Sequence, residues 1–165
     1  MKINKDHMYY GAALTQVAEH KSFKAINAVR NDSGAASRSA FLINTDVGLF
    51  LKYATKPKGP FKEFVFTFHS DHLRELEALR KKTKKLFISF VCVSASQICS
   101  LPYDTFLDLI AARKRSKKAD EETYTILVVV PKGKSFRVYV NPAGEKKQKL
   151  SQKIIARDDF PDTLF

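Results

Sequence analysis

The sequence is poor in cysteine and has no long apolar run. Only two of its 165 residues are cysteines, Cys92 and Cys99, so a disulfide framework is excluded and a reducing compartment is expected. No stretch approaches the roughly 18 consecutive apolar residues that a membrane-spanning helix needs. The first seven residues, MKINKDH, lack the apolar core of a secretory signal. We therefore expect a cytoplasmic protein that has no membrane partner.

Several common catalytic motifs are absent as well. The chain contains neither a Walker loop nor a GxGxxG pattern, which disfavours nucleotide-dependent catalysis of the P-loop or Rossmann type. It also lacks the Gly-x-Ser-x-Gly elbow of the serine hydrolases. The sequence therefore indicates no particular reaction, and the partner of the protein has to be inferred from its charge.

Acidic residues are scarce, because 17 aspartates and glutamates face 29 lysines and arginines, which gives a formal net charge of +12. Apolar residues make up 44% of the chain, so it can bury a core and is not a disordered polycation. The length fits one domain. We expect a single basic domain over residues 1–157, a tail over 158–165, and a polyanionic partner.

Apolar periodicity predicts three helices and a mixed sheet. The first helix spans about 6–20, the second opens at Ser70, and the third begins at Pro102. An extended segment is expected over 23–29, and strands are expected over 39–44, 47–54, 61–68, 86–93, 97–101, 123–130 and 135–141. The predicted fold class is α/β (α+β), a single mixed β-sheet flanked by helices. Its order is α-β-β-β-α-β, followed by a helix and a β-hairpin.

Lysine and arginine gather in four clusters. Cations at the C-terminus of a helix complement its dipole by about 0.3–1 kcal/mol each, which explains one or two residues of each helix-ending run. The remaining cations repel one another, and phosphate groups would relieve this repulsion. The clusters are Lys56 and Lys58; Arg80, Lys81, Lys82, Lys84 and Lys85; Arg113, Lys114, Arg115, Lys117 and Lys118; and Lys146, Lys147, Lys149 and Lys153.

We expect the first three clusters to bind nucleic acid, DNA rather than RNA, mainly through its phosphates. The two helix-ending runs are expected to converge on one surface. On the last predicted hairpin Arg137 and Tyr139 share a face, and we expect them to contact nucleic acid, with Tyr139 available for stacking on bases. The alternative partners are an acidic protein, as in a subunit of a nucleoprotein complex, or a second copy of the chain.

The predicted order over residues 6–93 resembles the core of the PD-(D/E)XK nucleases, the restriction-endonuclease-like fold. In that family an Asp of the second strand and an acid of the third hold Mg²⁺, and a Lys helps to activate water. The resemblance implies Asp46 and Glu63 as metal ligands and catalytic residues. The residue two after Glu63 is Val65, so the lysine is missing, and Lys52 on the neighbouring strand is the substitute. A version of this core that only binds nucleic acid is the alternative.

Two further patterns in the sequence are weaker. His69, Asp71 and His72 could hold a metal, but they lie at a strand-to-helix junction and lack a further ligand, so helix capping is the preferred interpretation. The chain also resembles small uncharacterised bacterial proteins. That resemblance is carried by residues 10–12, 48–53, 66–68 and 160–161, and it implies no activity.

Overall fold

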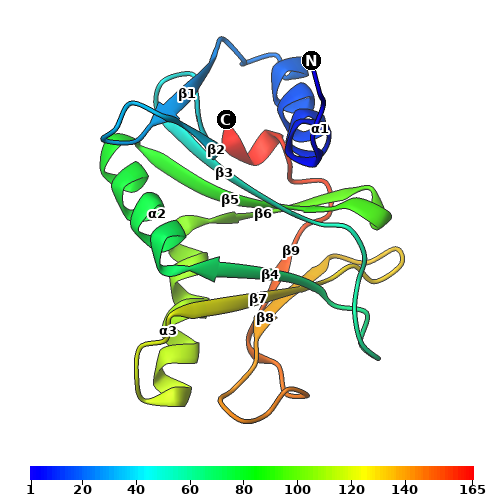
Figure 1. The fold of residues 1–165 in the computed structure, drawn as a ribbon. Helices are drawn as coiled ribbons and strands as arrows, with labels where there is room; N and C mark the ends of the chain where they lie inside the picture. The colour runs from blue at the N-terminus through cyan, green and yellow to red at the C-terminus, as the bar shows by residue number, and fades with distance from the viewer.

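The computed structural model describes all 165 residues and contains three α-helices and two β-sheets (Figure 1). The helices are α1 (Lys5–Glu19), α2 (Ser70–Lys82) and α3 (Tyr103–Lys117). The strands are β1 (Ile26–Arg30), β2 (Ala36–Ile43), β3 (Val47–Ala54), β4 (Phe64–His69), β5 (Lys85–Cys92), β6 (Gln97–Pro102), β7 (Thr123–Val129), β8 (Phe136–Val140) and β9 (Leu150–Ile155). Short 3₁₀ turns span Val93–Ala95 and Asp162–Leu164.

The larger sheet has five strands in the order β1-β2-β3-β5-β6. Its strands pair antiparallel except for β3 and β5, which are parallel. Parallel neighbours need a crossover connection, and here the chain leaves β3, forms β4 and α2, and returns as β5. Seven of the eight residues of β5 are buried, as expected for a central strand that is covered on both faces.

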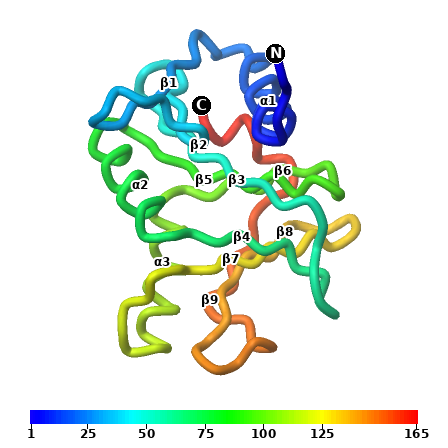
Figure 2. The backbone as a smooth tube through the Cα atoms, in the orientation of Figure 1, coloured from blue at the N-terminus to red at the C-terminus, as the bar shows by residue number.

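The smaller sheet has four antiparallel strands in the order β4-β7-β8-β9. It lies below the larger sheet in Figures 1 and 2, and α2 and α3 lie along one side of the pair. Phe64, Phe66 and Phe68 point from β4 into the core between the sheets, where they meet Phe50 and Phe90 of the larger sheet. This core holds 23 buried residues, so its apolar contacts are the main force that joins the two sheets.

A second core lies on the other face of the larger sheet. It is formed by Tyr10, Ala13 and Val17 of α1, together with Phe160 and Leu164 near the C-terminus. The helix is capped by Asn4, whose side chain accepts a hydrogen bond from the backbone N–H of His7 at 3.0 Å. The C-terminal residue Phe165 stacks on His20 with 4.1 Å between ring centres. The last residues therefore belong to the packed domain and are not the separate tail that we expected over 158–165.

The α/β class, with helices against a mixed sheet, is confirmed, but three details differ from the expectation. There are two sheets where one was predicted, because β4 pairs with β7 and not with β3 or β5. The segment 26–30 is a strand, so four strands precede α2 where three were predicted. Strand β9 was not predicted at all. None of the helices combines the length and apolarity needed to cross a membrane.

Candidate nucleic-acid interface

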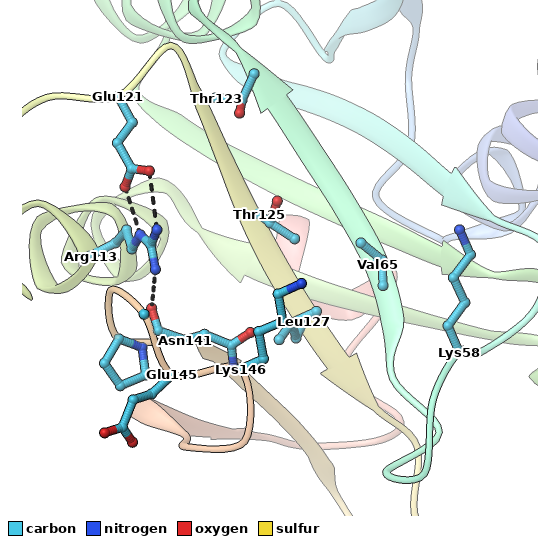
Figure 3. Close-up of a pocket in the computed structure, with 12 residues that line it drawn as sticks. Lys58, Val65, Arg113, Glu121, Thr123, Thr125, Leu127, Asn141, Glu145 and Lys146 are labelled. Carbon is cyan, nitrogen blue, oxygen red and sulfur yellow. Dashed lines mark hydrogen bonds and ion pairs between the residues drawn. The ribbon is translucent and has the colours of Figure 1, made fainter. Parts of the chain in front are cut away.

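The outward face of the four-stranded sheet carries an open hollow with a volume of about 720 Å³. Its floor is formed by Val65 on β4 and by Thr123, Thr125 and Leu127 on β7, which lie side by side in Figure 3. The two strands pair in register, with Val65 opposite Leu127. Side chains alternate along a strand, so the residues of β4 and β7 that do not face the core line this outward face.

One wall of the hollow is fixed by Arg113 of α3. Its Nε donates to Glu121 Oε1 at 2.6 Å, and its Nη2 donates to Glu121 Oε2 at 3.1 Å (Figure 3). A third hydrogen bond runs from Nη1 to the backbone oxygen of Asn141 at 3.0 Å. The hydrogen bonds from Arg113 hold the pKa of Glu121 below its ordinary value. Arg113 therefore has a defined structural partner and cannot contribute a free charge to a ligand without breaking it.

The loop between β8 and β9 forms the lower wall and supplies Lys146. One hydrogen bond ties this loop to α3, from Ala143 N to Ser116 Oγ at 2.8 Å, and a second, from Asn141 Nδ2 to Gln148 O at 2.9 Å, lies within the loop. The loop is therefore braced against α3 and internally, and it holds its lysines at the edge of the hollow.

The opposite wall is the loop between β3 and β4, which supplies Lys58. Lys58 and Glu63 pair through backbone hydrogen bonds of 2.7 and 2.9 Å. The turn between them needs a positive φ of 73° at Gly59, a conformation that glycine adopts without a steric penalty. Lys149, from the β8–β9 loop, lies over the rings of Phe61 and Tyr139 at 6.0 and 5.4 Å from their centres.

Three of the four predicted basic clusters therefore reach this hollow, through Lys58, Arg113 and Lys146. Two carboxylates also line it. Glu121 is neutralised by Arg113 and by Lys117, whose Nζ lies 3.4 Å from Oε2, whereas Glu145 forms no ion pair. With Lys149 included, the unpaired cations at the rim outnumber the unpaired carboxylates. We call this hollow and its rim the sheet-face hollow.

The basic run at the end of α2 lies elsewhere, so the predicted convergence of the two helix-ending runs is wrong. Arg80, Lys84 and Lys85 lie beside Tyr103 and Asp104, at the start of α3. The second run, residues 113–118, lies further along α3, which begins at Tyr103, and this separation is about 15 to 22 Å at 1.5 Å per residue. Figures 1 and 2 show the C-terminal end of α2 near the top of the left side of the molecule and that of α3 near the bottom.

Individual members of the basic runs also have local roles. Arg80 Nη1 donates to the backbone oxygen of Thr83 at 3.1 Å just after the end of α2, which satisfies one of the carbonyls that a helix leaves free. Lys114 lies 3.4 Å from Asp120. Other members of the basic clusters form no ion pair in the structure, namely Lys56, Lys81, Lys82, Lys84, Lys85, Arg115 and Lys118.

Tyr139 does not serve as predicted. Tyr139 is completely buried, because Lys149 and the β3–β4 loop cover it, and its hydroxyl donates a hydrogen bond to the Glu63 carboxylate. A buried ring cannot stack on a base. Arg137 is half-buried, and its guanidinium donates to the backbone oxygen of Ser135 at 3.0 Å.

The structure does not bring Asp46 and Glu63 together. Asp46 lies in the β2–β3 turn, where its backbone oxygen accepts from Lys84 N at 2.8 Å. Glu63 precedes β4, which belongs to the other sheet. The two strands meet where Lys52 Nζ donates to Thr67 O at 2.6 Å. At about 3.3 Å per residue, Asp46 is about 20 Å and Glu63 about 13 Å along its strand from that contact, and Figure 1 shows β3 and β4 beginning at opposite ends.

Lys52 thus has a structural contact and lies far along the strands from both carboxylates. Its Nζ is placed 5.1 Å from the centre of the Phe68 ring, and burial lowers its pKa. No group of three or more histidine, cysteine, aspartate or glutamate side chains is placed to hold a metal ion. The pair of carboxylates that the nuclease resemblance implies therefore cannot share one Mg²⁺ in this arrangement.

The junction of β4 and α2 shows the predicted capping. The backbone N–H of His69 donates to His72 Nδ1 at 3.0 Å, and the N–H of His72 donates to Asp71 Oδ1 at 3.1 Å. Both bonds satisfy donors at the start of α2 that have no partner within the helix. Nδ1 accepts here, so the neutral ring carries its proton on Nε2.

Sequence reasoning missed the polar floor and walls of the sheet-face hollow. Thr123, Thr125 and Asn141 line it, and their only signal in the sequence is the alternation of polar and apolar residues in β7 and at the end of β8. Such alternation identifies the face of the strand that points away from the core, but it does not predict that two loops surround that face. Comparisons with protein-family models, curated proteins and solved structures found no match.

Proposed function

We propose that this protein binds nucleic acid, DNA in the first instance, and that the sheet-face hollow contacts the phosphate backbone. The observation that carries the proposal is the meeting of Lys58, Lys146 and Lys149, which come from two loops far apart in the chain and form no ion pair, at the rim of one open sheet face. Cations that gather from distant parts of a chain bring a repulsive energy, which a bound polyanion removes by displacing its counterions.

The shape and chemistry of the hollow fit such a ligand. Its floor offers threonine hydroxyls and the Asn141 amide beside a small apolar strip, while its rim carries Lys58, Lys146 and Lys149. Phe61, which is 42% exposed at the same rim, is the aromatic ring available to stack on a base. Phosphate contacts of this kind position a protein on nucleic acid and carry little sequence information.

The test is a binding assay on single-stranded and double-stranded DNA and RNA over a series of salt concentrations, with and without Mg²⁺. The triple variant Lys58→Ala, Lys146→Ala, Lys149→Ala should bind more weakly at every salt concentration. The slope of log K against log salt should become less negative by about 2 to 3, because each lost phosphate contact lowers the magnitude of the slope by about 0.7 to 0.9.

A matched control removes the same charge from another surface. Lys5, Lys21 and Lys24 lie on or near α1, on the far side of the larger sheet, and their replacement by alanine lowers the net charge equally. If both triple variants lose the same affinity, binding follows total charge and the sheet-face hollow has no special role. If the wild-type protein binds no nucleic acid at low salt, the proposal is wrong.

The same assay separates the other functions. Loss of substrate only in the presence of Mg²⁺ would favour a nuclease, for which the separated Asp46 and Glu63 give no support. An absence of binding to nucleic acid, combined with capture by an acidic protein, would favour an interaction subunit. We also propose a cytoplasmic location, which is supported by two buried cysteines that form no disulfide.

A further inference from the structure

A second groove lies between the β1–β2 hairpin and α2, away from the sheet-face hollow, and has a volume of about 700 Å³. The hairpin contributes Arg30, Asn31 and Arg38, and α2 contributes His72, Arg74 and Lys82. None of the three arginines belongs to a basic run in the sequence. The fold brings together two arginines of the hairpin and one of α2, two segments that are far apart along the chain.

The cations of this groove have no acidic partners. None of the five ion pairs in the structure involves Arg38, Arg74 or Lys82. Arg30 donates only to the backbone oxygen of Gly34, at 2.9 Å. In contrast, Arg113 of the sheet-face hollow is held on two sides by Glu121. The arginines of the groove are therefore free to bind an anion.

Four carboxylates line the groove too, and two of them are already engaged. Glu75 accepts a hydrogen bond from the Ser37 hydroxyl, and Asp71 accepts one from the backbone N–H of His72. Asp6 belongs to the first turn of α1, where the helix dipole stabilises its charge. Asp32 lies in the turn of the hairpin. The four carboxylates equal the four cations of the groove in number, so an anionic group is favoured only where it lies closer to the arginines than to the carboxylates.

His72 adds a neutral donor to this groove. Its Nδ1 accepts the hydrogen bond from His69 N, so the uncharged ring donates through Nε2–H. Burial, and the positive charge of Lys52, lower the pKa of His72, so the ring stays neutral at pH 7. A neutral imidazole can donate to a phosphate oxygen without requiring a proton from solution.

We propose that this groove binds a phosphate ester of nucleotide size, with Arg38 and Arg74 contacting the phosphate. The planar guanidinium fork matches two phosphate oxygens at once, and the volume lies in the range of small-molecule sites, roughly 300 to 1,000 Å³. Lys82 also lines the neighbouring hollow with Lys81 and Lys84, so the cationic path continues onto the end of α2. The phosphate could belong to a free nucleotide or to the end of a nucleic-acid strand.

Calorimetric titration at low salt with a nucleoside 5′-monophosphate, with the same nucleoside and with inorganic phosphate tests the proposal. The monophosphate should bind and the nucleoside should not. Arg38→Gln and Arg74→Gln should each weaken binding by about tenfold or more, as expected for loss of a hydrogen bond to a charged group. Lys21→Gln, at an exposed position after the end of α1 that forms no ion pair, removes the same charge and should leave the affinity unchanged.

Two oligonucleotides of one sequence, with and without a 5′-phosphate, distinguish the sources. If the phosphorylated strand binds more tightly than the mononucleotide, and its binding depends on Arg38 and Arg74 in the same way, the ligand is the end of a strand. If the mononucleotide binds more tightly than the phosphorylated strand, the ligand is a free nucleotide. Equal affinity for nucleoside and monophosphate, or an equal loss with Lys21→Gln, would overturn the proposal. Should Arg38→Gln fail to fold, Arg74→Gln, on an exposed helix position, still decides it. The outcome is independent of the sheet-face hollow, whose lysines are not replaced.

Discussion

The hydroxyl of Tyr139 donates a hydrogen bond to the carboxylate of Glu63, a residue 76 positions earlier in the chain. This contact fastens the β3–β4 loop to the face of β8. Burial and the nearby carboxylate both raise the pKa of Tyr139, which keeps the hydroxyl protonated as a donor. The sequence predicts base stacking for Tyr139 and metal binding for Glu63, whereas in the structure each residue holds the other in place.

Tyr139→Phe should therefore lower the free energy of unfolding by about 1–3 kcal/mol, because a carboxylate loses its hydrogen-bond donor in a covered site. Nucleic-acid binding should be unchanged, since the ring is fully buried. Urea unfolding measures the first quantity and the salt-series binding assay the second. Tyr9→Phe is the control, because the Tyr9 hydroxyl has no hydrogen bond in the structure, and it should be close to neutral. Unchanged stability of Tyr139→Phe would contradict the role assigned to the contact.

Elements with a strong apolar pattern could be predicted from the sequence, but the partners of the strands could not. Phe64, Phe66 and Phe68 share the buried face that their alternation predicted. The period of two identifies the face of a strand that is buried, and it carries no information on which strand lies beside it. Strand β4 therefore looked like a third member of one sheet, although it pairs with β7, about 60 residues later.

Strand β9 and the hollow were missed for a related reason. Among its six residues, Lys153 interrupts the apolar pattern and Ile154 is 64% exposed, so the segment has no clear buried face. Sequence clustering located the lysines of residues 146–149, but not their approach to Lys58, which depends on two loops that meet only in the folded chain. Arg38 and Arg74 gave no signal because each is a single basic residue in its own segment.

The Arg113–Glu121 pair makes stability depend on pH. Hydrogen bonds from Arg113 lower the pKa of Glu121 in the folded state below its ordinary value of 4.5, so its contribution is present above that value and is lost as the pH falls through the folded pKa. Glu121→Gln should destabilise the protein at pH 7 by about 1 kcal/mol. The difference from the wild type should shrink as the pH falls below about 4.5.

Chemical denaturation at pH 7, 5 and 3 measures this dependence. Glu122→Gln is the matched control, because Glu122 is exposed and forms no ion pair, and its effect should be small at each pH. A Glu121→Gln variant whose destabilisation does not change with pH would show that the charge of Glu121 contributes nothing to the pair.

His72 should titrate below its ordinary pKa of 6.5, because burial and the charge of Lys52 disfavour its protonated form. In the unfolded chain the ring binds a proton at a higher pH, so the stability contributed by neutral His72 is full above about 6.5 and decreases as the pH falls. Protonation also removes the lone pair that accepts from His69 N. The side-chain resonances of His72, followed by NMR from pH 8 to 5, give the pKa directly.

A pKa of His72 at or above its ordinary value of 6.5 would contradict this prediction, because the ring would then not be held in its neutral form by the fold. In that case its proposed role as a neutral donor in the groove between the hairpin and α2 would also fail.

Gly48 and Gly11 should respond to alanine in opposite directions. A Cβ atom at Gly48 would lie 2.9 Å from Leu86 Cδ1 and 3.1 Å from Leu79 Cγ, whereas a Cβ atom at Gly11 would meet no atom within 4 Å. Gly48→Ala should therefore destabilise the protein by about 1–3 kcal/mol through overpacking between β3 and α2. Gly11 lies inside α1, so Gly11→Ala should stabilise it by about 1 kcal/mol because alanine loses less backbone entropy. Thermal unfolding of the two variants under one condition compares them, and a stabilising Gly48→Ala would mean that α2 packs less closely on β3 than the structure describes.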